Sequence, residues 1–331
     1  MGQEAIIKKT SNSQNGFWGL VKAHIFDIFS VLGLALCIVI FTVTSGGNLW
    51  NAYNISILIE TVCGYMILSL GALFVYSMGF MDVSVGVQLG VYSILMIFIL
   101  NSTGSMLLAF ITVLVLALLC GAFNGAVAVW LGLPSIVTSL FLMFVFGGIQ
   151  YILIERTGSN MISVENYDIN KFADPKIMIL AMVVVGIIVF YAFNFTKLGK
   201  YTKSIGANEK TTAQCGVNTT LWKVIAYMMF GVCVAIAAVF LLARTGSAGK
   251  GTGSTYAMDI MLCIILGGMP LSGGMSSKVR CAVIGTLTYV LLSNGLTLSG
   301  VDIQTIHIIK AVIFLAIVLL TCRDKSKILP R

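Results

Sequence analysis

Long runs of apolar residues alternate with short polar segments along almost the whole chain. A helix that crosses a lipid bilayer needs about 20 consecutive apolar residues. The pattern predicts about ten membrane-spanning helices, at residues 24–44, 53–77, 84–100, 106–130, 135–154, 177–195, 223–243, 257–270, 281–297 and 305–322. The eighth span is short, so we expect it to be tilted or broken. The predicted fold is an all-α polytopic membrane protein with one membrane domain (24–322), an N-terminal segment (1–23) and a short tail (323–331).

Composition supports this class and excludes a soluble domain. Hydrophobic residues make up 58% of the 331 residues, and charged residues only 10%. A soluble domain carries about 25% charged residues, so this chain could not cover a water-facing surface. The eight cysteines form no CxxC pair and the two histidines lie far apart, which predicts no metal site and no cofactor. The sequence also lacks a GxxxxGK[ST] phosphate-binding loop and a GxSxG motif, so we do not expect an enzyme.

The distribution of lysine and arginine predicts the orientation. With the N-terminus inside, most of the 20 basic residues fall in the inner segments, as membrane proteins prefer. Both termini are then cytoplasmic, which requires an even number of spans. Trp130 and Trp222 would lie at the inner interface and Trp50 at the outer one, where aromatic residues concentrate. The net charge of +8 is therefore explained by topology and contact with anionic lipid, and we expect no nucleic-acid partner.

The longest inner loop contains a polar stretch, "SIGANEKTTAQCGVN", at residues 204–218. Asn208 is suited to cap a short helix, Glu209 then lies in its first turn, and Gly216 is suited to end it. A helix of about two turns is not stable alone in water, so something must hold it. It could rest on lipid headgroups or dock on a cytoplasmic protein. Its weakly apolar face favours docking, and consists of Ala207, Thr211, Thr212, Cys215 and Val217.

Ionisable residues inside a membrane are candidates for function. Asp82, in "GFMDVSVG", could cap the helix that begins near Val83, take part in gating or substrate contact, or form an ion site. No second intramembrane carboxylate is evident to build a proton relay with it. Glu60 and Lys310 lie in the outer halves of spans, where they could reach the interface or pair. The polar groups that could line a pathway are Asp82, Ser84, Gln88, Asn124, Ser135, Thr138 and Asn294, and hydrogen bonding between helices is the alternative role for each.

The polar stretch, extended to "LGKYTKSIGANEKTTAQCGVNTTLWKVIAY", resembles the coupling-helix segment of ribose-type ABC importer permeases. Three further segments are similar to motifs of that family: "GFMDVSVG" (79–86), "GAFNGAVAVWLGLPSIVTSL" (121–140) and "YAMDIMLCIILGGMPLSGGMSSKVRCAVIGTLTYVLLSNGL" (256–296). The resemblance covers about residues 50 to 320. The sequence departs from it at Met269-Pro270, where the family has Thr-Ser, and at Ser276, where it has glycine. The segments "GFMDVSVG" and "GGMPLSGG" also suggest an internal duplication.

The resemblance implies the permease subunit of an ATP-driven importer in a bacterial-type cell membrane. Its implied partners are a second permease copy or paralogue, a cytoplasmic ABC ATPase and an extracytoplasmic substrate-binding protein. The implied solute is a monosaccharide, such as a ribose-like pentose or a hexose. Other cargoes are an autoinducer sugar, a nucleoside or a branched-chain amino acid, and other classes are an ion-coupled transporter or a membrane receptor. The residues implied to couple to the ATPase are Gly206, Asn208, Glu209, Thr212, Ala213, Gly216 and Val217.

Overall fold

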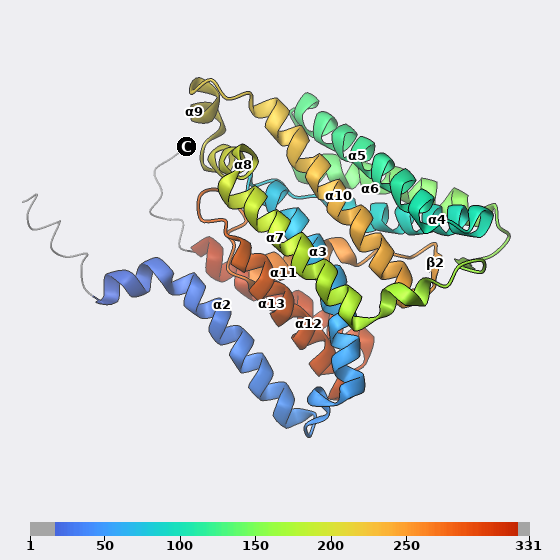
Figure 1. Cartoon of the computed structure of the whole chain (residues 1–331). Helices are drawn as coiled ribbons and strands as arrows, with labels where there is room; N and C mark the ends of the chain where they lie inside the picture. The colour runs from blue at the N-terminus through green and yellow to red at the C-terminus, as the bar shows by residue number, and fades with distance from the viewer. Residues whose placement is uncertain (1–16, 324–331) are drawn as a thin grey trace, which may run out of the picture.

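The computed structural model describes residues 17–323 and consists almost entirely of helices (Figure 1). Residues 1–16 and 324–331, which hold most of the two predicted cytoplasmic end segments, lie outside the described residues. The helices are α2 (Phe17–Thr44), α3 (Ala52–Tyr76), α4 (Val85–Thr103), α5 (Met106–Trp130), α6 (Ser135–Glu155), α7 (Pro175–Phe195), α8 (Lys197–Ala207), α9 (Glu209–Gln214), α10 (Thr219–Thr245), α11 (Tyr256–Leu266), α12 (Val279–Leu298) and α13 (Ile303–Arg323). Two 3₁₀ turns, η1 (Asn48–Trp50) and η2 (Ile169–Ala173), and two strands, β1 (Met161–Ser163) and β2 (Ser247–Gly249), complete the described chain.

Each predicted span coincides with a helix, and the all-α polytopic membrane fold is confirmed. Seven of the described helices are long and apolar enough to cross a membrane. Shorter apolar stretches lie in α2, α11 and α13. The eighth span is α11, which has only 11 residues, as its short apolar run predicted.

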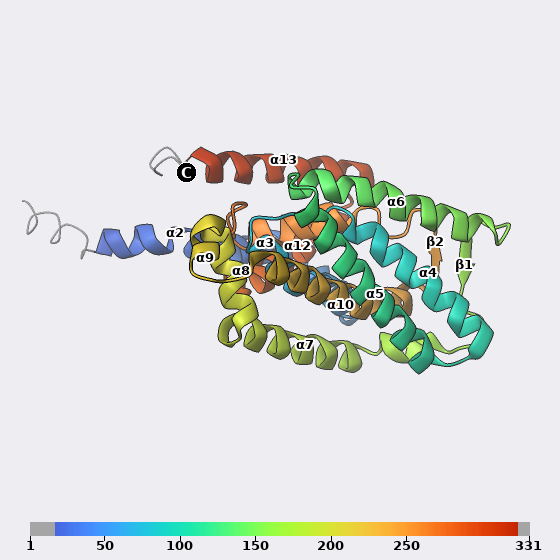
Figure 2. The same ribbon diagram turned by 90° about the horizontal axis from the view of Figure 1, so that it is seen from above.

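The interior of the bundle is built on α3, α4 and α10, whose side chains are mostly buried in the protein. In contrast, α5, α6 and α7 are strongly apolar yet expose most of their side chains. Figure 2 shows α7 on one side of the bundle and α6 on the other, with α3 and α10 between them. Because an apolar side chain gains nothing by facing water, the exposed faces of these outer helices are suited to contact with lipid.

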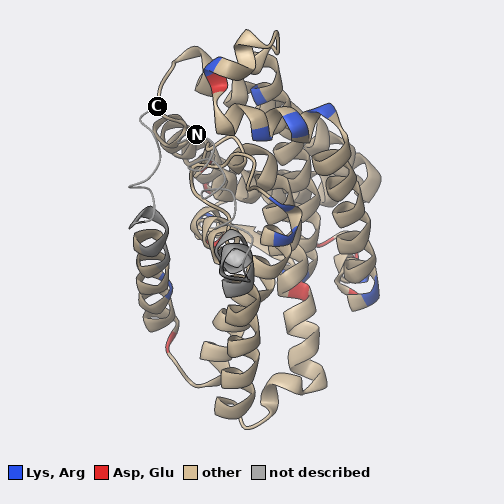
Figure 3. Ribbon diagram, turned by 90° about the vertical axis from the view of Figure 1, so that its left-hand side faces the viewer, with Lys and Arg blue, Asp and Glu red and all other residues tan. Residues whose placement is uncertain are grey.

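The two ends of the bundle differ. At one end β1 and β2 form an antiparallel pair in which Ile162 lies opposite Ala248. The other end carries α8 and α9, and the first turn of α2 and the last turn of α13 lie on this same side (Figure 1). In Figure 3 lysines and arginines lie mostly in the upper part of the picture, and most of the ribbon carries no charge. This arrangement agrees with an orientation in which α8 and α9 are cytoplasmic.

Two loops complete the inner end and are important below. The α3–α4 loop comprises residues 77–84, and the α11–α12 loop comprises residues 267–278. They lie against each other, because the backbone N–H of Gly274 donates to the carbonyl of Ser77 at 2.7 Å. The two segments that suggested an internal duplication thus meet in the folded chain.

Candidate functional site

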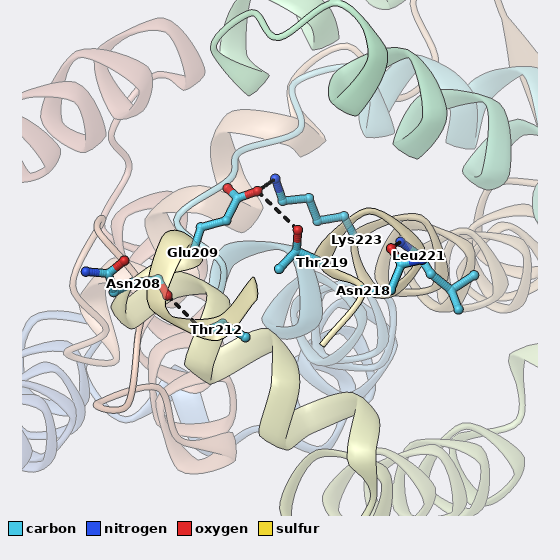
Figure 4. Close-up of polar contacts among 7 residues, drawn as sticks. All are labelled: Asn208, Glu209, Thr212, Asn218, Thr219, Leu221 and Lys223. Atoms are coloured by element: carbon cyan, nitrogen blue, oxygen red, sulfur yellow. Dashed lines mark hydrogen bonds and ion pairs between the residues drawn. The ribbon is translucent and has the colours of Figure 1, made fainter. Parts of the chain in front are cut away.

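The polar stretch forms two helices, and the second one follows the predicted local rules (Figure 4). α9 begins after Asn208, whose side-chain oxygen accepts a hydrogen bond from the backbone N–H of Thr211 at 3.1 Å. Glu209 lies in the first turn, where its charge favours the helix dipole. Gly216, with a φ of +81°, lies just beyond the end of α9 in a conformation that side chains rarely adopt. These three predictions are confirmed.

The polar stretch begins one helical turn before α9. Residues 204–207 are the last turn of α8, and the chain bends at Asn208. In the structure Gly206 is a buried helical residue that packs directly on neighbouring backbone.

The short helix α9 is held by α10. The Nζ of Lys223 lies 2.5 Å from Oε1 of Glu209, and the hydroxyl of Thr219 donates to the same oxygen at 3.4 Å (Figure 4). The side chain of Lys223 is buried, and its ammonium lies 4.9 Å from the centre of the Phe80 ring in the α3–α4 loop. A cation over an aromatic face is attracted to it, so Lys223 joins α9, α10 and this loop.

A groove of ≈ 370 Å³ lies beside α9, at the end of the bundle that carries α8. All five residues of the predicted docking face line it. The complete lining is Tyr201, Ser204, Ala207, Asn208, Thr211, Thr212, Cys215, Val217 and Met275. Met275 and Cys215 are exposed, and the lining is mostly apolar, so the groove has the character of a surface that a partner protein would cover.

Three lysines of α8 lie close to the predicted membrane interface. Lys197 and Lys200 are exposed, whereas Lys203 is half-buried, with its Nζ 4.1 Å from the centre of the Phe193 ring. Burial lowers the pKa of the Lys203 ammonium from its ordinary value. Cationic side chains at this level suit the orientation with α8 inside.

Four of the seven predicted pathway residues form one buried network, which we call the Asp82 cluster. Asp82 accepts hydrogen bonds from the backbone N–H of Ser84 at 2.9 Å, from the hydroxyl of Ser84 at 2.5 Å and from the side-chain amide of Asn124 at 2.6 Å. Gln88 donates to the hydroxyl of Ser84 at 2.8 Å. Asp82 therefore holds the turn that leads into α4 and also fastens this turn to α5. The predicted capping position is wrong by two residues, because α4 begins at Val85 and its N-cap is Ser84.

The other three predicted pathway residues lie outside that cluster. The hydroxyl of Ser135 accepts a hydrogen bond from the backbone N–H of Met81 at 3.0 Å, so it supports the α3–α4 loop from α6. Thr138 is buried, and its hydroxyl has no hydrogen-bond partner within the described part of the chain. Asn294 exchanges two amide hydrogen bonds with Asn54, at 2.9 and 3.1 Å, which joins α12 to α3.

A second buried polar group, the Asp259 cluster, joins four helices and was missed. Asp259 of α11 accepts a hydrogen bond from the hydroxyl of Tyr65 at 2.9 Å and lies 3.9 Å from the ammonium of Lys310. Lys310 also donates to the hydroxyl of Tyr289 at 2.7 Å. A second intramembrane carboxylate, which was not evident from the sequence, is therefore present, and its partners are Tyr65 and Lys310. Lys310 pairs with an acidic residue, which was one of the two roles considered for it. The aspartate in "YAMDIM" was the feature of the sequence that could have indicated this cluster.

Metal chemistry finds no support in the part of the chain described. There, no group of three or more histidine, cysteine, aspartate or glutamate side chains is placed to hold a metal ion. The described features are instead a membrane-embedded helical bundle, two buried polar clusters and a cytoplasmic groove beside a short, tethered helix.

These features define a polytopic membrane permease. Residues 54–321 match the family described as the permease component of branched-chain amino acid transport systems. The chain belongs to this family, whose members are non-catalytic permease subunits of ABC transporters. It is thus a multi-pass inner-membrane protein of a binding-protein-dependent system, which implies an ATPase and a binding protein as partners. The matched range agrees with the extent of the resemblance seen in the sequence.

Several characterised relatives are similar to nearly the whole chain. The ribose import permease protein RbsC of Escherichia coli K12 is 26% identical, over 94% of this chain and 98% of its own length. RbsC of Bacillus subtilis is 29% identical, over 89% and 92%. The galactose/methyl galactoside import permease protein MglC of E. coli K12 is 27% identical, over 88% and 92%. No solved structure matches the chain.

Proposed function

We propose that this chain forms the translocation pathway of an ATP-driven importer for a monosaccharide, such as a ribose-like pentose or a hexose. The observation that carries the proposal is the cytoplasmic groove beside α9, on a chain that belongs to a permease family over residues 54–321. Relatives named as ribose and galactose permeases, similar over most of their lengths, support a sugar as the solute.

The chemistry of the Asp82 cluster is compatible with a neutral solute. Its members offer hydroxyl and amide groups around one carboxylate, and sugars are bound through hydrogen bonds to such groups. The alternative cargoes are an autoinducer sugar, a nucleoside or a branched-chain amino acid. A zwitterionic amino acid would need opposite charges placed to meet it, whereas Asp82 has neutral donors around it.

The proposed complex contains two permease subunits, either identical or paired with a paralogue. An ABC ATPase binds at the cytoplasmic end, where Asn208, Glu209, Ala213 and Val217 would form the contact together with the groove. A binding protein delivers the solute at the opposite end, near β1 and β2. Closure of the ATPase on ATP displaces α9, and the permease alternates between inward and outward access. The pathway residues remain those predicted above, with the Asp82 cluster as its centre.

Reconstitution in proteoliposomes tests this function. The chain, its ATPase and its binding protein should take up labelled ribose only when all three and ATP are present. Ala213→Arg places a large cation on the exposed face of α9 and should abolish co-purification of the ATPase. Ser159→Arg, in the exposed outer loop, is the matched control and should leave co-purification unchanged.

Uptake at full rate without the ATPase would overturn the proposal and would favour an ion-coupled transporter built around the intramembrane charges. A panel of labelled solutes, containing pentoses, hexoses, a nucleoside and leucine, identifies the cargo in the same vesicles. Uptake of leucine in preference to any sugar would exclude the monosaccharide assignment while leaving the importer mechanism standing.

A further inference from the structure

The α3–α4 loop lies between the cytoplasmic helices and the Asp82 cluster. It begins at Ser77, the C-cap of α3, and ends at Ser84, directly before α4. Its first residues contact α8, its centre contacts Lys223, and its last residues are Asp82 and Ser84 themselves. One loop of eight residues thus touches both the proposed docking region and the proposed pathway.

At Gly206 the contact with α8 involves backbone atoms of the loops. A Cβ atom on Gly206 would lie 2.0 Å from the carbonyl oxygen of Ser77 and 2.7 Å from the backbone nitrogen of Gly274. Such distances are far below contact distance, so α8 reaches this position only with glycine at 206. The carbonyl of Ser77 is one of those that the end of α3 leaves without a helical partner, and Gly274 supplies its hydrogen bond.

The α11–α12 loop also packs against the backbone of Ser77. A Cβ on Gly273 would lie 2.4 Å from the carbonyl oxygen of Ser77, and a Cβ on Gly79 would lie 2.8 Å from that of Ser272. Three chain segments therefore approach one another through backbone atoms at these glycines. A displacement of one segment should therefore displace the others, because close-packed interiors are barely compressible and transmit strain.

The second contact runs through side chains. Glu209, in the first turn of α9, is paired with Lys223, and the ammonium of Lys223 lies over the ring of Phe80 in the α3–α4 loop. The side chain of Lys223 is only 8% exposed. A cytoplasmic partner that displaces α9 would act on this buried lysine through its ion pair with Glu209.

We propose that the α3–α4 loop carries the motion of α8 and α9 to the Asp82 cluster, with Gly206 and Lys223 as positioning residues. The proposal rests on the proposed function, since it assigns a route by which the ATPase would act on the pathway. A shift of α8 displaces Ser77 through the glycine contact, and a shift of α9 displaces Phe80 through Lys223. Either shift moves the turn that Asp82 and Asn124 fasten to α5.

Lys223→Met tests the side-chain contact, and Lys200→Met is the matched control on the exposed face of α8. Uptake of labelled ribose per ATP hydrolysed is measured in proteoliposomes that hold the complete complex. We expect Lys223→Met to lower uptake per ATP at least tenfold while the ATPase still co-purifies. Lys200→Met should stay within about twofold of the unmodified chain. Gly206→Ala should also lower uptake per ATP hydrolysed, because it disturbs the backbone contact with Ser77.

An unchanged ratio in the assembled Lys223→Met complex would overturn the proposal. So would a parallel loss of hydrolysis, uptake and melting temperature, which would indicate a merely structural lysine. Hydrogen–deuterium exchange on the unmodified complex is a measurement that needs no variant. A non-hydrolysable ATP analogue should change amide protection at 77–84 together with 209–214, and a change confined to 209–214 would also overturn the proposal. Failure of the proposed function looks different, because the unmodified complex would then show no ATP-dependent uptake.

Discussion

The Asp82 cluster and the Asp259 cluster both bury a carboxylate in the membrane domain, but they compensate its charge differently. Asp82 is surrounded by neutral donors, namely a backbone N–H, a hydroxyl and an amide. Asp259 meets the ammonium of Lys310 and the hydroxyl of Tyr65. The rings around it are packed closely, with Tyr65 stacked on Tyr256 at 4.8 Å between centroids.

The difference separates a site that can exchange partners from one that cannot. Neutral donors around Asp82 are of the kind that a sugar hydroxyl can replace, at a small net change in hydrogen-bond energy. An ion pair in a low-dielectric interior has no such freedom, because removal of either partner leaves a buried charge without compensation. The Asp259 cluster is therefore suited to fix the half-length helix α11 to α3, α12 and α13, while the Asp82 cluster is suited to change.

The largest effect should come from breaking the ion pair. Lys310→Met leaves Asp259 buried without its cation and should destabilise the protein by about 3–5 kcal/mol. Thermal unfolding in detergent measures this loss. The double variant Asp259→Asn/Lys310→Met removes both charges and should recover most of the stability. A double variant as unstable as the single one would show that the charge pair is not what holds α11.

A smaller effect should follow from neutralising Asp82. In Asp82→Asn the new amide group cannot accept every hydrogen bond that the carboxylate accepts, so one buried donor is left unpaired, at a cost of about 1–3 kcal/mol. The exchange variant Asp82→Asn/Asn124→Asp restores a donor and an acceptor across the contact and should recover part of the loss. If Asp82→Asn were as costly as Lys310→Met, the contrast between the two clusters would be wrong.

The amide pair of Asn54 and Asn294 supplies a neutral reference. Hydrogen bonds between membrane helices contribute about 0.6 kcal/mol on average, so Asn294→Ala should lower stability by roughly that amount. Sugar uptake by this variant, compared with uptake by Asp82→Asn, also tests whether Asn294 belongs to the pathway. Strong loss of uptake with little loss of stability would place Asn294 in the pathway after all.

The smallest effect should come from the exposed ion pair between Lys250 and Glu155 in the outer loops. The hydrogen bond from Lys250 to Glu155 raises the pKa of the ammonium above its ordinary value of 10.5. A raised lysine pKa gives stability that is complete below pH 10.5 and is lost only as pH rises through the raised value. Lys250→Met should therefore leave the melting temperature unchanged within error at pH 7, since water and salt screen exposed pairs. A clear drop would mean that the loops need this pair.

The sequence predicted features that depend on neighbouring residues. Asn208 accepts the N–H of a residue three positions on, and Asp82 accepts the N–H of a residue two positions on. Such contacts lie within one turn of the chain, so local sequence rules were enough to predict them. The spans follow from apolar length, including the short α11. These features need no knowledge of which helices touch.

Features that depend on tertiary contact were not predictable in the same way. Asp259 and Lys310 belong to different helices, and nothing local shows that they meet. The close contact of Gly206 was not predictable either, because a glycine in a polar stretch is compatible with a turn as well as with a close helix contact, and only the position of Ser77 distinguishes the two. The coupling and pathway roles of the predicted residues stay predictions, since they concern partners and motion.

The groove residue Cys215 offers a natural site for thiol labelling beside α9. Among the cysteines whose side chains are described it is the exposed one, and the others are buried or partly buried. After replacement of Cys322 by serine, a membrane-impermeant maleimide dye should attach at this thiol from the cytoplasmic face alone. The same dye would then reveal both the sidedness of the chain and the moment at which a docked subunit shields α9, with no engineered label.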